Sequence, residues 1–421
     1  MNNDFLSPKN KKPSPKHQSD EPTELPNEET TDSKETLKPI TPITPITLDI
    51  DMSLDDSNTK KALKKKRRNP KQWFLGLTKK QKIITVIVGF LLLVVMASGV
   101  LLAVSGNKAS APTVKKSSKA KVVKPTTEPS KLSGLPVKPE LNKRGVTGVM
   151  IENSLDARPQ AGIIDAGVVF EAIAEGGITR FLALFQDTQP DSIGPVRSVR
   201  PYYLDWLQGF SAPIAHAGGS AEGLNKIKDD DIDDINDNVP TFYRVSNRTA
   251  PHNLFTTSAK LDEFRTKNNY PAAAFTGFPR KKAQPSAKPT AKTINFAISS
   301  TDFNVRYDYD ATTNSYKRSM GGVPHLDEKS KTQISPKVVI ANIMNYTIID
   351  SQGHSGYNTI GSGQSYIFQD GNVIVGSWEK TSSTSQITFK DSRGNDVKFN
   401  PGNTWISAVN NAPSVTYAPA P

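Results

Sequence analysis

A continuous apolar run occupies residues 83–105 and contains no charged side chain. A helix of that length spans the roughly 30 Å hydrocarbon core of a bilayer. A helix buried in a globular core would instead show polar positions about once a turn. The pattern therefore predicts one transmembrane helix, with the two flanking parts of the chain on opposite sides of a membrane.

Beyond the membrane, the pattern from about residue 140 to residue 270 predicts a mixture of strands and helices. Gly176-Gly177 joins two buried strands in the manner of a hairpin. Ser220 and Ser258 are expected to cap two of the helices. Strands are predicted at 146–153, 166–176, 178–186 and 213–219, and helices at 199–210, 220–228 and 258–268.

The second half of this part is predicted to be rich in strands. A loop rich in Pro, Ala and Lys precedes it, and Asp370-Gly371 has the composition of a tight hairpin turn. Strands are expected at 293–299, 303–310, 315–320 and 336–344, in a hairpin over 365–380, and in a second hairpin over 385–400. The fold class is therefore α+β: a mixed α/β N-terminal domain followed by a β-rich C-terminal domain, preceded by the membrane helix and a disordered tail.

These patterns divide the chain into seven parts. The first 59 residues are rich in Pro, Ser, Thr and acidic side chains, and cannot bury enough apolar surface to fold. They include the repeat TPITPIT at residues 41–47, which is either an inert spacer or a docking peptide. The predicted parts are a disordered basic cytoplasmic tail (1–82), a transmembrane signal-anchor (83–105), a Lys/Pro/Ser tether (106–139), the N-terminal domain (140–270), a linker (271–292), the C-terminal domain (293–410) and a tail (411–421).

Charge fixes the orientation of the membrane helix. Residues 60–82 hold eleven Lys and Arg and no acidic residue, which keeps that side in the cytoplasm. A cleaved signal peptide would have a shorter apolar region nearer the N-terminus. We expect a single-pass protein of the cell membrane with a cytoplasmic N-terminus and an extracytoplasmic C-terminal body.

The formal net charge of +12 does not indicate a nucleic-acid partner. Residues 135–421 carry 29 Lys and Arg against 28 Asp and Glu, so the excess lies beside the membrane helix and in the tether. There it is suited to anionic lipid. The chain has no cysteine, which excludes disulfides, thiolate chemistry and a lipid-modified cysteine anchor.

Several motifs occur in order along the body: ARPQAG (157–162), EGGITRF (175–181), GPVRSVRPYY (194–203), APHNL (250–254), DGNVIVGSW (370–378) and PGNTW (401–405). Together they resemble the YerB-like family of bacterial surface proteins, over roughly residues 140–410. The resemblance implies a two-part extracytoplasmic body of unknown function, and it supplies no established catalytic residue. The common form of the family is a lipoprotein, whereas this chain, without cysteine, is expected to use its membrane helix as the anchor.

Four arginines in these motifs are candidates for binding an anionic ligand, because the guanidinium fork suits carboxylate and phosphate. The alternative is that they form structural ion pairs with nearby glutamates. Arg197 and Arg200 would point to one side of a helix, as an anion clamp, or to opposite sides of an extended segment. The arginines are Arg158, Arg180, Arg197 and Arg200.

The glutamates Glu152, Glu171 and Glu175 allow an enzymatic alternative. Cleavage of a glycosidic bond needs two carboxyl groups that face one cleft about 5–10 Å apart. Glu171 and Glu175 are four residues apart, which places both on one face of a strand unless a bulge intervenes. Most such pairs on a strand are simply solvated or salt-bridged.

His216, which follows the apolar strand residues PIA, and His252, in the segment TAPHNL, are candidates for a metal or proton-transfer site. They lack the spacing of a metal site such as HExxH, and His252 is better suited to fixing a turn. The acidic run at 229–238 lacks the Gly and Glu of a calcium loop and is predicted to be a solvated loop. No phosphate-binding loop or nucleophile elbow occurs, so we expect neither a metal nor a cofactor.

Two classes of function follow from these observations. The first is a noncatalytic envelope protein that binds an anionic cell-wall polymer or a wall-synthesis protein. The second is a glycan-cleaving enzyme that acts on peptidoglycan with paired carboxylates. The sequence leaves open whether the protein is an enzyme.

Overall fold

The structure is a computed structural model that describes residues 126–272 and 274–419. No helix in this part of the chain is long and apolar enough to cross a membrane. The predicted membrane helix, the cytoplasmic tail and most of the tether lie outside the described residues.

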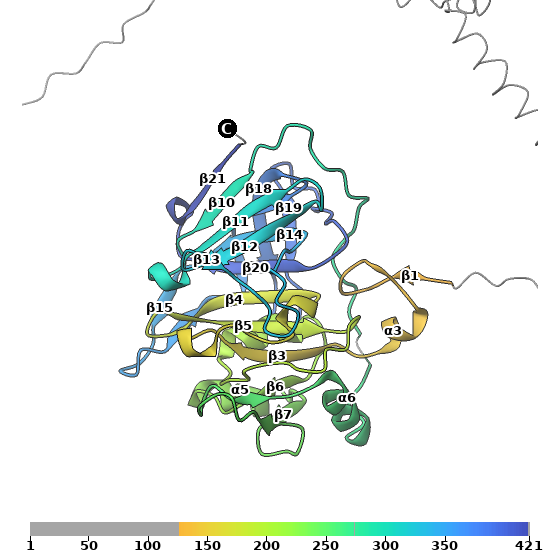
Figure 1. Cartoon of the computed structure of the whole chain (residues 1–421), viewed down its shortest axis with the longest axis vertical. Coiled ribbons are helices and arrows are strands. Elements are labelled where there is room, and N and C mark those ends of the chain that lie inside the picture. The colour runs from red at the N-terminus through yellow and green to blue at the C-terminus, as the bar shows by residue number, and fades with distance from the viewer. Residues whose placement is uncertain (1–125, 273, 420–421) are drawn as a thin grey trace, which may run out of the picture. The chain divides into compact units, whose positions relative to one another are not determined.

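A ten-stranded sheet forms the centre of the folded body (Figure 1). Its strands come from both the mixed N-terminal region and the β-rich C-terminal region, which therefore share one sheet. In spatial order the strands are β19 (Thr388–Asp391), β18 (Asn372–Lys380), β17 (Gly361–Gln369), β14 (Val338–Ile343), β20 (Thr404–Val409), β4 (Val168–Glu175), β5 (Ile178–Phe185), β3 (Thr147–Glu152), β6 (Ile214–His216) and β7 (Asp234–Asn236).

Strand β20 joins the two regions. It lies between β14 and β4 and is parallel to both, with Ile406 opposite Ile340 on one side and opposite Phe170 on the other. All six of its residues are buried. A strand buried on both faces with continuous apolar neighbours is typical of the middle of a sheet.

A second sheet covers one face of the first. Its order is β13-β12-β11-β10-β21, and its buried side chains share a core with inward-facing residues of the large sheet, such as Val169, Phe181 and Trp405. Its strands are β10 (Thr293–Phe296), β11 (Val305–Asp310), β12 (Ser315–Met320), β13 (Val323–Pro324) and β21 (Val415–Ala418).

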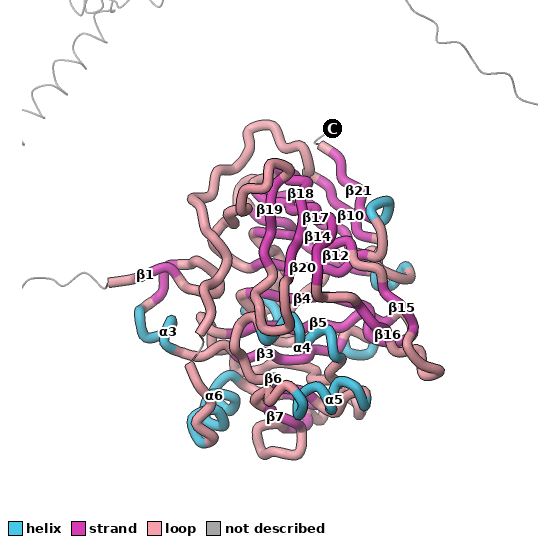
Figure 2. Tube along the Cα trace, turned by 180° about the vertical axis from the view of Figure 1, so that it is seen from behind, coloured by secondary structure: helices cyan, strands magenta, loops and turns pink. Residues whose placement is uncertain are grey.

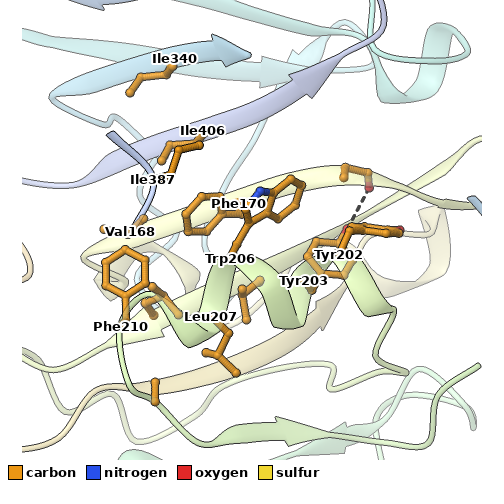
Figure 3. Packing of buried hydrophobic residues seen from close by; sticks show 14 of the residues in the cluster. Val168, Phe170, Tyr202, Tyr203, Trp206, Leu207, Phe210, Ile340, Ile387 and Ile406 are labelled. Atoms are coloured by element: carbon orange, nitrogen blue, oxygen red, sulfur yellow. Dashed lines mark hydrogen bonds between the residues drawn. The ribbon is translucent and has the colours of Figure 1, made fainter. Parts of the chain in front are cut away.

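Helix α4 (Pro201–Gln208) covers the opposite face of the large sheet, as the view from behind shows (Figure 2). Pro201 begins the helix, where its missing N–H costs no hydrogen bond. Trp206 stacks on Phe170 with ring centroids 5.2 Å apart, and Tyr203 donates a hydrogen bond to the Ala172 carbonyl (Figure 3). The aromatic side of α4 therefore fixes it to β4.

Short elements complete the body. They are helices α3 (Pro139–Lys143), α5 (Ala221–Asp229) and α6 (Ser258–Lys267), the 3-10 turns η1 (Leu155–Ala157), η2 (Ile163–Asp165), η3 (Thr301–Phe303) and η4 (Ala412–Ser414), and three hairpins. The hairpins pair β1 (Glu128–Pro129) with β2 (Pro136–Val137), β8 (Tyr243–Arg244) with β9 (Leu254–Phe255), and β15 (Tyr346–Ile348) with β16 (Ser355–Tyr357).

Most predicted strands and helices are confirmed. A region with helices followed by a β-rich region is confirmed. The two regions are less separate than predicted, because they share the ten-stranded sheet. Ser220 caps α5 by accepting from the Gly223 N–H, as predicted, but the cap of α6 is Thr257 and not Ser258. The predicted second hairpin at 385–400 contains only one strand, β19, because the returning segment bridges to β19 only between Lys390 and Asp396.

Two further expectations need correction. Residues 128–137, predicted as tether, form the β1–β2 hairpin and bury Leu132 in the core. The acidic run at 229–238 is not wholly a solvated loop, because β7 within it extends the sheet and buries Ile235. The other domain limits stay predictions.

Candidate functional site

The charged residues of the sequence motifs gather mainly at one end of β3, β4 and β5. Arg180 on β5 and Glu152 on β3 are paired neighbours in the sheet. Each lies two residues from an apolar side chain that packs toward α4, Leu182 and Met150 respectively. Alternation along a strand therefore places both charged side chains on the α4 face.

Glu175 forms the first cluster, at the end of β4. Its carboxylate accepts from Arg180 Nη2 at 2.9 Å and pairs with Arg200 through its other oxygen. His354 Nε2 lies 4.0 Å from the same carboxylate and its other ring nitrogen pairs with Asp350. Burial lowers the pKa of both arginines, because desolvation disfavours the charged guanidinium group.

Glu152 forms the second cluster, with Arg197 Nε at 3.3 Å and His252 Nδ1 at 3.0 Å from one carboxylate oxygen. Ser154 Oγ donates to that same oxygen at 2.9 Å. In a nucleophilic triad the serine contacts the histidine nitrogen opposite the carboxylate. Here Ser154 Oγ lies 3.4 Å from His252 Nδ1, the same ring nitrogen that contacts the carboxylate, so the three groups do not have the order of a triad.

Arg197 and Arg200 lie on extended backbone. Val196 bridges to Ile151, Val199 bridges to Gly219, and Arg200 has φ −132° and ψ 153°. Consistent with an extended segment, the two guanidinium groups contact different glutamates. This is the geometry of structural pairs and not of a two-arginine clamp.

Glu171 lies on the opposite face of the sheet from Glu175. The register of β4 against β5 shifts between Ile173 and Glu175, so the condition for a shared face, a strand without a bulge, is not met. Glu171 is fully buried. These two carboxylates therefore do not face one cleft.

Arg318 on β12 neutralises Glu171. Its Nη2 lies 2.9 and 2.8 Å from the two carboxylate oxygens, and both side chains are inaccessible to solvent. Trp405 Nε1 and Ser407 Oγ each donate to the carboxylate at 3.1 Å. The guanidinium also lies 4.6 Å from the Trp405 ring centroid. This buried pair therefore connects the two sheets.

Arg318 is not among the candidates predicted from the sequence, although its strand carries a signal. In the strand SYKRSM, the alternation puts Arg318 on the same side as the apolar Tyr316 and Met320. A buried arginine requires a buried acceptor. That alternation could have predicted a pair with one of the buried-strand glutamates, but not which one.

The remaining candidates have separate surroundings. His216 is buried and contacts the Gly218 carbonyl at 2.6 Å and Asp234 at 2.8 Å, which ties β6 to β7. Arg158 lies in the loop after η1, near η3, and forms no ion pair with any of the three glutamates. Within residues 126–272 and 274–419, no three His, Cys, Asp or Glu side chains are placed to hold a metal ion.

Comparison with known proteins places this body in a family. Family models described as the N-terminal and C-terminal domains of a protein of unknown function (DUF3048) match residues 132–271 and 293–406. The chain belongs to the DUF3048 family. The predicted YerB-like resemblance is therefore confirmed, since the relatives of this family include YerB.

YerB of Bacillus subtilis matches this chain both in sequence and in structure. The chain is 30% identical over 284 residues to a Bacillus subtilis protein named "Putative lipoprotein YerB", covering 66% of this chain and 85% of that protein. The crystal structure of YerB from Bacillus subtilis matches with a TM-score of 0.62 and 28% identity, over 68% of this chain and 98% of the other. The DUF3048 models carry no assigned function.

Proposed function

We propose that this DUF3048 protein is a noncatalytic binding or scaffold module of the cell envelope. It is held at the membrane by the helix at residues 83–105 and projects its body outside the cell, where it binds an anionic wall polymer or a wall-synthesis protein. The apolar run, its basic flank and the word lipoprotein in the relative's name all support this location.

The observation that carries the proposal is that each candidate carboxylate is occupied by arginine. Glu152 pairs with Arg197, Glu175 with Arg180 and Arg200, and Glu171 with the buried Arg318. A glycosidase needs one carboxyl group with a proton to donate and a second that acts on the sugar or on water. Carboxylates held by guanidinium groups favour a structural role over either task.

The alternative is cleavage of peptidoglycan, and it retains one pair of carboxylates. Glu152 and Glu175 lie on the same face of the sheet, and the Glu175 side chain is 29% exposed. A substrate that displaced the arginines would leave both carboxylates available for catalysis. Release of soluble muropeptides from purified wall material separates this alternative from binding.

Co-sedimentation tests the proposal. The full-length chain, purified in mild detergent, is mixed with purified wall material, with and without its anionic polymers. We expect the chain in the pellet with intact wall, less of it after removal of the polymers, and less again as salt rises. A chain that stays in the supernatant under all conditions contradicts direct wall binding and leaves the wall-synthesis protein to be tested by crosslinking.

A further inference from the structure

A small pocket of about 220 Å³ opens beside the loop that follows η1. Most of its wall is apolar and comes from β13 and the residues beside it. Its two polar side chains are Arg158 and His325. The pocket is lined by Arg158, Pro159, Met320, Val323, Pro324, His325 and Leu326. Pockets for drug-sized ligands are usually about 300–1,000 Å³, so this one suits a smaller group.

Arg158 differs from the arginines of the glutamate clusters because it pairs with no carboxylate in the described part of the chain. It donates to the side-chain and backbone oxygens of Asn153, each at 3.2 Å, and to the Asp302 carbonyl at 3.0 Å. Its guanidinium lies 4.9 Å from the Phe303 ring centroid. Three of its five N–H groups are used, and each partner is an uncharged oxygen.

The charge of Arg158 is only weakly offset by its surroundings. Behind the pocket, Arg318 is neutralised by Glu171. His325 contacts Arg318 through Nδ1, and since arginine only donates, Nδ1 accepts and the imidazole is neutral. The carboxylate of Asp302 is exposed, where water screens it. Burial lowers the pKa of Arg158, so an anion that reached it would meet a poorly solvated cation.

We propose that this pocket binds the C-terminal end of a peptide whose last residue has a small apolar side chain. The terminal carboxylate takes the free N–H groups of Arg158, and the side chain lies against the apolar wall at Val323 and Leu326. The volume limits the occupant to about the last residue. This inference rests on the proposed binding function and names a ligand for it.

The test compares two probes that differ only in charge at the end: acetyl-alanyl-alanine and the same peptide with a C-terminal amide, in both L and D forms. Their affinities for the full-length chain in detergent are measured by isothermal titration calorimetry. We expect at least one acid form to bind about tenfold more tightly than its amide, because a charged hydrogen-bond partner is lost in the amide. Equal affinities, or no heat with any acid at millimolar concentration, overturn the proposal.

A charge change at the pocket rim avoids the risk of unfolding. Val323 is 60% exposed, so Val323→Glu and Val323→Lys should both fold. We expect the preference for the acid over the amide to be about tenfold lower in Val323→Glu than in Val323→Lys. Both variants lose the same apolar contact with Val323, so that loss cancels in the comparison. Arg306→Gln, at an exposed arginine on β11, is the matched control and should change nothing. Equal preferences for the acid over the amide in the two Val323 variants overturn the proposed site.

Wall co-sedimentation of the same variants separates the two proposals. Retention on the wall with no difference between acid and amide rejects the pocket and leaves the binding function standing. Selective peptide binding without any retention on the wall rejects wall polymer as the partner and leaves the pocket standing.

Discussion

The buried pair of Glu171 and Arg318 shows how single residues hold this fold together. Replacing one partner leaves an uncompensated charge between the two sheets, which costs about 3–5 kcal/mol. We therefore expect Glu171→Gln and Arg318→Met each to lower the free energy of unfolding by that amount, measured by urea titration. The double variant Glu171→Leu, Arg318→Met should recover much of the loss. Single variants as stable as the wild type would contradict the role of the pair.

An exposed pair supplies the control for that measurement. Arg306 and Asp308 on β11 have side chains 54% and 43% exposed. Exposed ion pairs contribute about 0–1 kcal/mol, so Arg306→Gln should fall within that range.

Lys380, at the end of β18, gives the stability a specific pH dependence. Burial lowers its pKa to about 8, and its ammonium donates to the carbonyls of Ser383 and Ser385. In the unfolded chain a lysine pKa is about 10.4. Between these values the unfolded state binds more protons, so stability rises with pH across that window and is insensitive to this group below it.

Comparison with Lys380→Met isolates this effect. The variant does not titrate there, so the wild type should gain stability relative to the variant between pH 7 and pH 9.5. Urea titrations at the two pH values measure it. A difference between the two proteins that stays constant with pH would show that Lys380 keeps an ordinary pKa.

Strand β20 is the element on which both regions depend, because it pairs with β14 on one side and β4 on the other. A chain that ends at residue 403 lacks β20 and exposes two long strand edges. We expect it to lose cooperative unfolding, measured by circular dichroism during heating. A chain that ends at residue 410 lacks only η4 and β21 and should still unfold cooperatively at a lower temperature. Cooperative unfolding of the shorter chain would contradict the role of β20.

At this scale the sequence predicts local elements well and their partners poorly. Alternation and turn residues are enough for the β17–β18 hairpin, where Asp370 and Gly371 both have positive φ. The parallel partners of β20 lie more than sixty residues away along the chain, and no local pattern encodes them. The bulge before Glu175 is equally invisible, although it decides which face the carboxylate takes.

In the candidate site, too, the sequence predicts the residues better than it predicts their partners. Eight of the nine candidates, all except Arg158, lie in ion pairs within the described part of the chain, as the structural alternative anticipated for the arginines that meet glutamates. The sequence could name these residues but not their partners. Arg158 resembled the other arginines in sequence, and only its surroundings distinguish it.

For the whole folded body, the shared sheet predicts one cooperative unit despite the two family domains. The described part of the linker, residues 271–272 and 274–292, is irregular but buries Phe275 and Phe278 in the core that α4 shares. We therefore expect a single unfolding transition in scanning calorimetry, with a calorimetric enthalpy equal to the van't Hoff enthalpy. Two separated transitions would show that the regions fold independently.

The most direct test of the account is a time course of product release from wall material. Purified peptidoglycan is incubated with the full-length chain, and soluble muropeptides are quantified by mass spectrometry beside Glu152→Gln and Glu175→Gln variants. A noncatalytic binding module predicts no release above the protein-free control from any of the three proteins. Release that grows with time and with wild-type concentration, and that is lost in either variant, would contradict it.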